Sequence, residues 1–142
     1  MAASEHLPGD SRQERPMSEI STRRLREQSQ LDFEIEFIGR VLDRDPYYAD
    51  AVHVHANNLA ARGEYARALH LDRRLVRLQP DRPIPWYNLA CSYSVLGMVD
   101  PAFHALERSL ELGYSHLRHL CRDPDLKPLH RDPRFTRLIR RF

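Results

Sequence analysis

Apolar residues recur every three or four positions over long stretches of this chain of 142 residues, which is the spacing of the buried stripe of an amphipathic helix. One such pattern lies on both sides of Gly63 and comprises Val52, Ala56, Leu59, Ala68, Leu69, Leu75, Val76 and Leu78. A glycine between two apolar stripes allows the tight turn that joins antiparallel helices. The pattern therefore predicts a helical hairpin with its turn at Gly63.

The hairpin pattern returns after 34 residues without a gap. This shift aligns Ala56 with Ala90, Gly63 with Gly97, Ala68 with Ala102, Val76 with Leu110, and Leu78 with Leu112. We therefore predict two consecutive repeats, residues 49–82 and 83–116, each made of two short helices. The paired alanines are small enough to let neighbouring helix axes approach closely, so the hairpins are expected to stack on one another.

The second repeat has a characteristic order of residue types: Trp86, Tyr87, Asn88, Leu89, Ala90, Tyr93, Gly97, Ala102, Leu106 and Leu110. The first repeat shares this order at Ala56, Gly63 and Ala68. The order resembles the tetratricopeptide repeat (TPR), which has the same period, and Tyr65 and the closing Pro80 of the first repeat also fit the TPR pattern. This resemblance implies an all-α fold, a right-handed superhelical stack of antiparallel helical hairpins.

Two polar residues depart from the family pattern within the first repeat. His55 stands where the family usually has Leu, and Asp72 stands where the second repeat has Leu106. We interpret His55 as a buried side chain that is satisfied by a neighbouring carbonyl group. We interpret Asp72 as a sign that the second helix of this repeat exposes a more polar face to solvent.

Weaker helical patterns flank the two repeats within one predicted domain, residues 17–142. Upstream, an apolar stripe indicates one or two degenerate helices in residues 19–48 that pack on the first repeat; it comprises Leu31, Ile35, Ile38, Val41 and Leu42. Residues 1–16 have no apolar periodicity, and we expect them to be disordered.

Downstream, Asp123-Pro124 and Asp132-Pro133 each predict a helix start. The Asp side chain would accept a hydrogen bond from a free backbone amide, and the Pro would occupy the first helical position. The pattern predicts short helices at about 116–122, 124–130 and 133–141. This C-terminal segment, residues 117–142, resembles the capping segment that commonly ends bacterial TPR arrays.

The composition fits one folded, water-soluble domain and excludes several classes of protein. The chain is 42% hydrophobic and 30% charged with a formal net charge of +2, which gives no general attraction for nucleic acid. No apolar run approaches the roughly 20 residues of a membrane helix, and the first two dozen residues lack a secretory signal. We therefore expect a cytoplasmic location, with Cys91 and Cys121 as reduced thiols.

Signatures of enzymes and metal sites are missing from the sequence. There is no glycine-rich phosphate loop, no GxSxG motif and no HExxH motif. His116 and His119 form a pair with three-residue spacing, but no third ligand lies on the same helix face. We predict a protein without catalytic residues, cofactor or metal ion.

Stacked hairpins form a concave groove, lined mainly by the first helix of each hairpin, and such grooves bind an extended peptide or a partner helix. We therefore predict a noncatalytic adaptor or scaffold that binds a protein or peptide partner. Some TPR domains grip the free C-terminal carboxylate of a peptide with Lys, Asn and Arg residues at set spacings. The same spacings give His53, Asn57, Asn88, Arg118 and Arg122 in this chain.

Guanidinium groups suit a carboxylate because they donate charge-assisted hydrogen bonds, whereas a plain solvated face is the alternative interpretation of these residues. The predicted peptide-binding groove comprises His53, Asn57, Tyr87, Asn88, Cys91, Arg118 and Arg122.

Two further hypotheses concern other surfaces. The N-terminal helix carries Phe33, Ile35, Phe37 and Ile38, so the chain could be a structural subunit that homodimerises or docks onto a larger assembly. The terminal helix carries a basic stripe that could bind an acidic partner or an RNA backbone; it comprises Arg131, Arg134, Arg137, Arg140 and Arg141.

Overall fold

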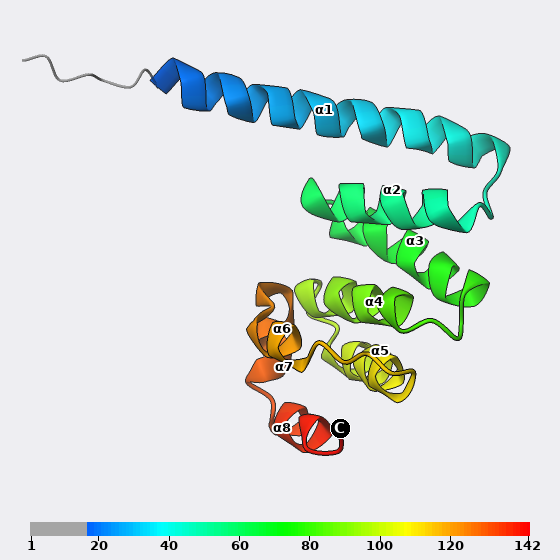
Figure 1. Ribbon diagram of the computed structural model, residues 1–142, viewed down its shortest axis with the longest axis vertical. Coiled ribbons are helices and arrows are strands. Elements are labelled where there is room, and N and C mark those ends of the chain that lie inside the picture. The colour runs from blue at the N-terminus through cyan, green and yellow to red at the C-terminus, as the bar shows by residue number, and fades with distance from the viewer. Residues whose placement is uncertain (1–16) are drawn as a thin grey trace, which may run out of the picture.

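Helices account for all the regular secondary structure of residues 17–142, the part of the chain that the computed structural model describes (Figure 1). The expected disorder of residues 1–16 concerns residues outside this range. The elements are α1 (Met17–Arg44), α2 (Ala49–Ala61), α3 (Tyr65–Leu78), α4 (Pro83–Val95), α5 (Val99–Glu111), α6 (Leu117–Arg122), the 3-10 turn η1 (Pro124–Leu126), α7 (Lys127–His130) and α8 (Pro133–Ile139). The predicted all-α stack of helical hairpins is confirmed.

The helices stack in chain order. Helix α2 pairs with α3, α4 pairs with α5, and α3 packs on α4 to join the two hairpins (Figure 1). Both hairpin turns contain a glycine in the left-handed region of backbone conformation, Gly63 with φ of 85° and Gly97 with φ of 76°. A side chain is disfavoured there because its Cβ crowds the backbone, so glycine permits the sharp reversal.

We expect Gly97→Ala to lower the free energy of unfolding by about 1 kcal/mol, measured by urea denaturation. An added Cβ would meet no other heavy atom within 4 Å, so the cost comes from the backbone conformation alone. Gly39→Ala is the matched control, because Gly39 lies inside α1 and its Cβ would make an ordinary contact of 3.7 Å with His55. That control should stabilise the helix slightly. Equal stability of Gly97→Ala and the wild-type chain would contradict the prediction.

The apolar core continues from the second hairpin into the C-terminal segment. Leu106 of α5 is fully buried, and so are Leu120, Leu126 and Leu129 of the short helical pieces that follow. These leucines cover the end of the stack that would otherwise expose apolar surface to water.

Both predicted Asp-Pro helix starts are confirmed. The Asp123 side chain accepts a hydrogen bond from the backbone N–H of Asp125 at 3.0 Å, at the start of η1. Asp132 accepts one from the backbone N–H of Arg134 at 2.9 Å, at the start of α8. These are standard helix caps, and each satisfies an amide that lacks a partner within the helix.

The two departures from the family pattern differ from expectation. Asp72 is only 3% exposed and accepts a hydrogen bond of 2.6 Å from the Ser92 hydroxyl of α4. The prediction that α3 exposes a polar face to solvent is therefore wrong at this position. His55 is buried as expected, but its Nδ1 has no hydrogen-bond partner among the described residues. The proximity of a second helix decides both outcomes, because α4 supplies the partner of Asp72 and α1 approaches His55 at Gly39.

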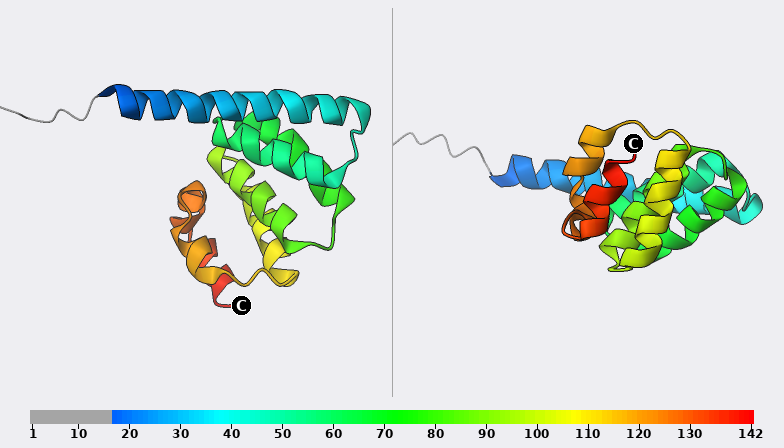
Figure 2. Two further views of the ribbon diagram at one scale, coloured as in Figure 1. Left: turned by 45° about the horizontal axis from the view of Figure 1, so that its top comes forward. Right: turned by 90° about the horizontal axis from the view of Figure 1, so that it is seen from below.

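The upstream segment is one continuous helix of 28 residues, α1. Its C-terminal half packs on the first hairpin through Ile35, Ile38 and Leu42. Residues 21–30 are exposed, and this end of α1 extends beyond the hairpins (Figure 2).

Candidate functional site

A cavity of about 210 Å³ lies where the first helices of the two hairpins, α2 and α4, meet the segment after α6. Four of the seven predicted groove residues line this cavity: Asn57, Tyr87, Asn88 and Cys91. Its polar lining also includes Tyr65, Asp72, Ser92, His119, Asp123 and Asp125. The packing of α3 on α4 therefore places two asparagines that are 31 positions apart in the chain around one cavity.

Tyr87 ties the wall of this cavity to the C-terminal segment. Its hydroxyl donates a hydrogen bond of 2.5 Å to the Asp123 carboxylate, and its ring stacks on Tyr114 with centroids 4.4 Å apart. Burial and the hydrogen bond to Asp123 raise the pKa of Tyr87 well above its usual range, so the hydroxyl keeps its proton. Tyr87 is only 6% exposed, and its polar atom is already used within the fold.

Cys91 lies beside the same carboxylate. Its Sγ is 3.8 Å from Oδ2 of Asp123. Burial, with the neighbouring carboxylate of Asp123, raises the pKa of the Cys91 thiol far above its usual range. The thiolate is the reactive form of cysteine, so this side chain lines the cavity as a protonated, unreactive thiol.

The cavity lining is acidic, because it contains three aspartates, Asp72, Asp123 and Asp125. Burial raises the pKa of Asp72 to about 6, and the hydrogen bond from Ser92 offsets only part of this shift. Burial and the nearby Asp123 carboxylate raise the pKa of Asp125 above its usual value. The His119 ring lies beside this carboxylate, with its Nε2 3.5 Å from Oδ2 of Asp123. The cavity thus favours ligand groups that donate hydrogen bonds over groups that carry negative charge.

The other three predicted groove residues lie outside this cavity. His53 is 3.2 Å from the Asn57 amide nitrogen and lines a neighbouring cavity of about 290 Å³ at the start of α4. Arg118 and Arg122 of α6 are exposed and line neither of these two cavities. Each is two residues from Leu120, the buried residue of this helix, so the helical turn directs both side chains away from the interior.

Sequence reasoning does not assign the three aspartates of this cavity to the site. It identifies Asp123 only as a helix cap, and Asp72 only as a polar substitution in an apolar stripe. Both become site residues because chain reversals place α3, α4 and the turn at residues 123–125 around one space. No local signal carries that information.

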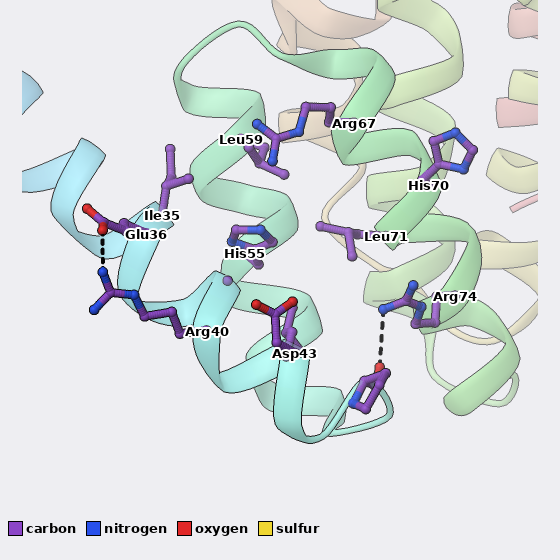
Figure 3. A pocket seen from close by; sticks show the side chains of 13 residues that line it. Ile35, Glu36, Arg40, Asp43, His55, Leu59, Arg67, His70, Leu71 and Arg74 are labelled. Carbon is purple, nitrogen blue, oxygen red and sulfur yellow. Dashed lines mark hydrogen bonds and ion pairs between the residues drawn. The ribbon is translucent and has the colours of Figure 1, made fainter.

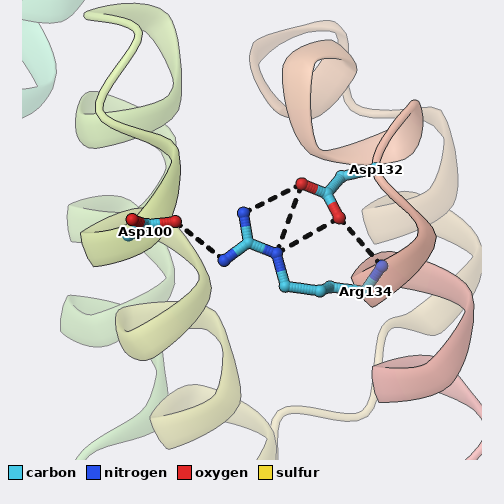
Figure 4. Close-up of polar contacts among 3 residues, drawn as sticks. All are labelled: Asp100, Asp132 and Arg134. Atoms are coloured by element: carbon cyan, nitrogen blue, oxygen red, sulfur yellow. Dashed lines mark hydrogen bonds and ion pairs between the residues drawn. The ribbon is translucent and has the colours of Figure 1, made fainter.

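The C-terminal basic stripe is partly used for packing. The Arg134 guanidinium binds Asp100 of α5 at 2.7 Å and Asp132 at 2.9 Å (Figure 4). It also lies 4.5 Å from the centre of the Phe103 ring. Arg141 binds Glu107 of α5 at 2.7 Å. These contacts dock α8 on α5 and leave a smaller free positive charge than the sequence predicts.

A wider hollow of about 800 Å³ lies between α1 and α3, over His55 (Figure 3). Three arginines line it, but each is already hydrogen-bonded within the fold. Arg40 contacts Glu36 at 2.5 Å, Arg67 contacts Glu64 at 3.0 Å, and Arg74 donates to the backbone oxygen of Pro46 at 3.2 Å. The hollow therefore has no uncommitted set of arginines for an anionic ligand.

Metal clusters and membrane-spanning helices are both absent from the described chain. Within residues 17–142, no group of three or more His, Cys, Asp or Glu side chains is placed to hold a metal ion. Over the same residues, no helix has the length and apolar character needed to cross a membrane.

Known proteins resemble parts of this chain. No protein-family model matches it. Over 83 residues, 56% of the chain, it is 32% identical to a chloroplastic protein of Arabidopsis thaliana, and the match covers 25% of that protein. Over 57 residues, 40% of the chain, it is 30% identical to the cell division cycle protein 16 homologues of Mus musculus and Homo sapiens, with 9% of each covered. The chain thus spans a quarter or less of the length of these relatives.

Proposed function

We propose that this chain is a noncatalytic protein-binding module, an adaptor or scaffold, that holds an extended peptide across α2 and α4. One observation carries the proposal: Asn57 and Asn88, from the first helices of adjacent hairpins, line a single cavity. Helical repeat stacks commonly use this arrangement to read an extended chain, because successive first helices present side chains at regular intervals.

The two asparagines are suited to contact a peptide backbone. An amide side chain both donates and accepts hydrogen bonds, as a peptide group does. Asn57 is exposed and Asn88 is half-buried at the cavity wall. Within residues 17–142, the Asn88 amide has no hydrogen-bond partner. It is therefore available to a ligand without loss of an existing contact.

The helices that carry these amides also carry exposed apolar side chains. Val54 of α2 is 41% exposed, and Ile84 and Val95 of α4 are 43% and 38% exposed. Aliphatic groups and amides exposed on the same helices give the mixed surface that peptide-binding grooves use.

The charge of the cavity favours an internal peptide segment over a free C-terminal carboxylate. A carboxylate placed beside Asn57 and Asn88 would approach Asp123 and Asp125, and the arginines that would attract it lie on the outside of α6. Like charges at short range are repulsive and are weakly screened in a partly enclosed space. A peptide with a basic or neutral side chain at this point avoids that repulsion.

The test is a selection from a random peptide library, followed by fluorescence anisotropy with the selected peptide. We expect Asn57→Ala with Asn88→Ala to weaken binding by roughly 30-fold, because two hydrogen bonds are lost. The free energy of unfolding should change by less than about 0.5 kcal/mol, since neither amide supports the core.

Arg73→Ala is the matched control, because Arg73 is an exposed side chain of α3 that does not line this cavity. It should leave the affinity unchanged. If the double asparagine variant bound the selected peptide as tightly as the wild-type chain, the proposed groove would be wrong. If the variant unfolded, the asparagines would be structural residues.

A further inference from the structure

One carboxylate oxygen of Asp72 is free inside the cavity that Asn57 and Asn88 line. The Ser92 hydroxyl donates its hydrogen bond to Oδ2 of Asp72, and Oδ1 has no hydrogen-bond partner within residues 17–142. Asp72 is only 3% exposed, yet Oδ1 is not a fully buried atom, and the cavity is the space that Asp72 lines. This oxygen is therefore available to a ligand group that donates a hydrogen bond.

The repeat pattern does not require an acid at this position. The shift of 34 residues that relates the two repeats aligns Asp72 with Leu106, which is fully buried in the second hairpin. A buried carboxylate costs stability that a leucine would not, because its charge loses solvation. A costly acid in place of an apolar core residue, at the wall of a cavity, favours a ligand site over a packing role.

Two more carboxylates line the same cavity, and no Lys or Arg of residues 17–142 does so. Asp123 accepts hydrogen bonds from the Tyr87 hydroxyl and from the backbone N–H of Asp125, so it contributes mainly negative charge. The Asp125 carboxylate has no hydrogen-bond partner in the described part of the chain. Burial raises the pKa of Asp72 and of Asp125, as expected for acids whose desolvation is not offset by a cation. The cavity thus has two free acceptors and no positive charge to balance them.

We propose that this cavity binds the ammonium group of a lysine side chain of the bound peptide. The inference rests on the proposed function, in which Asn57 and Asn88 hold the peptide backbone at the same cavity. The ammonium group donates hydrogen bonds to Oδ1 of Asp72 and to the Asp125 carboxylate. Its charge offsets the repulsion among the three aspartates, which is weakly screened in a partly enclosed space.

The position of the free oxygens favours an ammonium group over a guanidinium group. They come from two separate elements, α3 for Asp72 and η1 for Asp125. The three N–H groups of an ammonium point in different directions, so one ammonium contacts both acids. A guanidinium group is a planar fork that pairs best with both oxygens of one carboxylate, and Ser92 already occupies one oxygen of Asp72.

The remaining lining suits the aliphatic part of a lysine. Ala56, Ala60 and Tyr65 also line the cavity. They offer apolar surface to the four-carbon stem, which lysine side chains bury while the charged end stays in a polar environment. The volume of about 210 Å³ is several times the roughly 30 Å³ that one water occupies in the liquid, so a long side chain fits.

The first test uses n-butylammonium, which reproduces the lysine side chain without a peptide. In an NMR titration we expect it to shift the side-chain amide signals of Asn57 and Asn88 with a millimolar dissociation constant. The constant should rise about 10-fold in Asp72→Asn, because a charged acceptor is lost. This variant should fold, since asparagine can still accept the hydrogen bond from Ser92 and carries no buried charge.

Asp81→Asn is the matched control, because it removes the same charge from an exposed residue outside the cavity. It should leave the dissociation constant of n-butylammonium unchanged. Equal shifts with n-butanol, which has no charge, would overturn the ammonium site. So would an affinity that Asp72→Asn leaves at the wild-type value.

The second test uses the peptides selected against the wild-type chain. We expect a lysine at one position, and its replacement by norleucine should weaken binding about 30-fold in fluorescence anisotropy. Replacement by arginine should weaken binding about 10-fold, and Asp72→Asn should remove most of the difference between lysine and norleucine.

The outcomes separate this inference from the proposed function. A selected peptide that needs Asn57 and Asn88 but tolerates the loss of every lysine would overturn the inference and leave the groove standing. If no peptide were selected and n-butylammonium still bound, the proposed function would be wrong, and the cavity would be a site for a small free amine instead of a lysine side chain.

Discussion

Asp72→Asn is expected to raise the free energy of unfolding by about 3 kcal/mol at pH 8. In the folded chain Asp72 is 3% exposed, and burial raises the pKa of its carboxyl group from 3.8 to about 6. At pH 8 this carboxyl is therefore ionised inside the stack of α3 on α4, where its charge is poorly solvated. Asparagine has the same shape and can still accept the hydrogen bond from the Ser92 hydroxyl, but it carries no charge.

The sign of the pH dependence follows from the direction of this shift. The folded chain holds the Asp72 proton more tightly than the unfolded chain, so the stability that the neutral carboxyl contributes is complete below pH 3.8. That contribution is lost as the pH rises through about 6. The advantage of the asparagine variant over the wild-type chain should therefore be small at low pH, grow across this window and stay constant above it.

Urea denaturation of both chains at a series of pH values measures this difference. Asp81→Asn is the control, because Asp81 is exposed in the turn before α4, and its effect should stay within about 0.5 kcal/mol at every pH. A difference between Asp72→Asn and the wild-type chain that did not change with pH would mean that Asp72 is not the titrating group. A lower stability of the variant at pH 8 would contradict the prediction outright.

We expect Asp123→Ala to lower the free energy of unfolding by about 3 kcal/mol. The substitution removes the charged acceptor of the buried Tyr87 hydroxyl and the cap of η1 in one step. The hydroxyl would then be buried without a partner, which adds a desolvation cost to the lost bond. Helices α6–α8 depend on this connection to α4, so they should become sensitive to protease before the hairpins do.

Chemical denaturation and limited proteolysis test this prediction together. Tyr87→Phe is the matched variant, because it removes the hydroxyl but leaves Asp123 to cap η1. It should cost about half as much as Asp123→Ala. A loss below about 1 kcal/mol in Asp123→Ala would show that the leucines of the cap hold it in place without this hydrogen bond.

The predictions that hold concern local features of the chain. The spacing of apolar residues predicts the hairpins α2–α3 and α4–α5, and the glycines mark turns that adopt positive φ. The caps at Asp123 and Asp132 are also predictable, since each joins a side chain to a backbone amide two residues further on. Such features depend on neighbours within one helical turn, and a sequence contains all of those neighbours in order.

The placement of polar residues depends on contacts between distant parts of the chain. The sequence pattern predicts that Asp72 is exposed to solvent, yet this residue is buried against Ser92, which is 20 residues further along the chain. Tyr87 is joined to Asp123 across 36 residues, and this contact gives the candidate cavity its acidic wall.

Periodicity along one helix shows which side is apolar, but not which side chain of another helix will meet it. Whether a buried polar group is tolerated depends on such a partner, because an unpaired group pays a desolvation cost that a hydrogen bond offsets. The helices and their turns therefore follow from the order of the residues, whereas the acidic cavity exists only once the hairpins and the C-terminal segment have packed together.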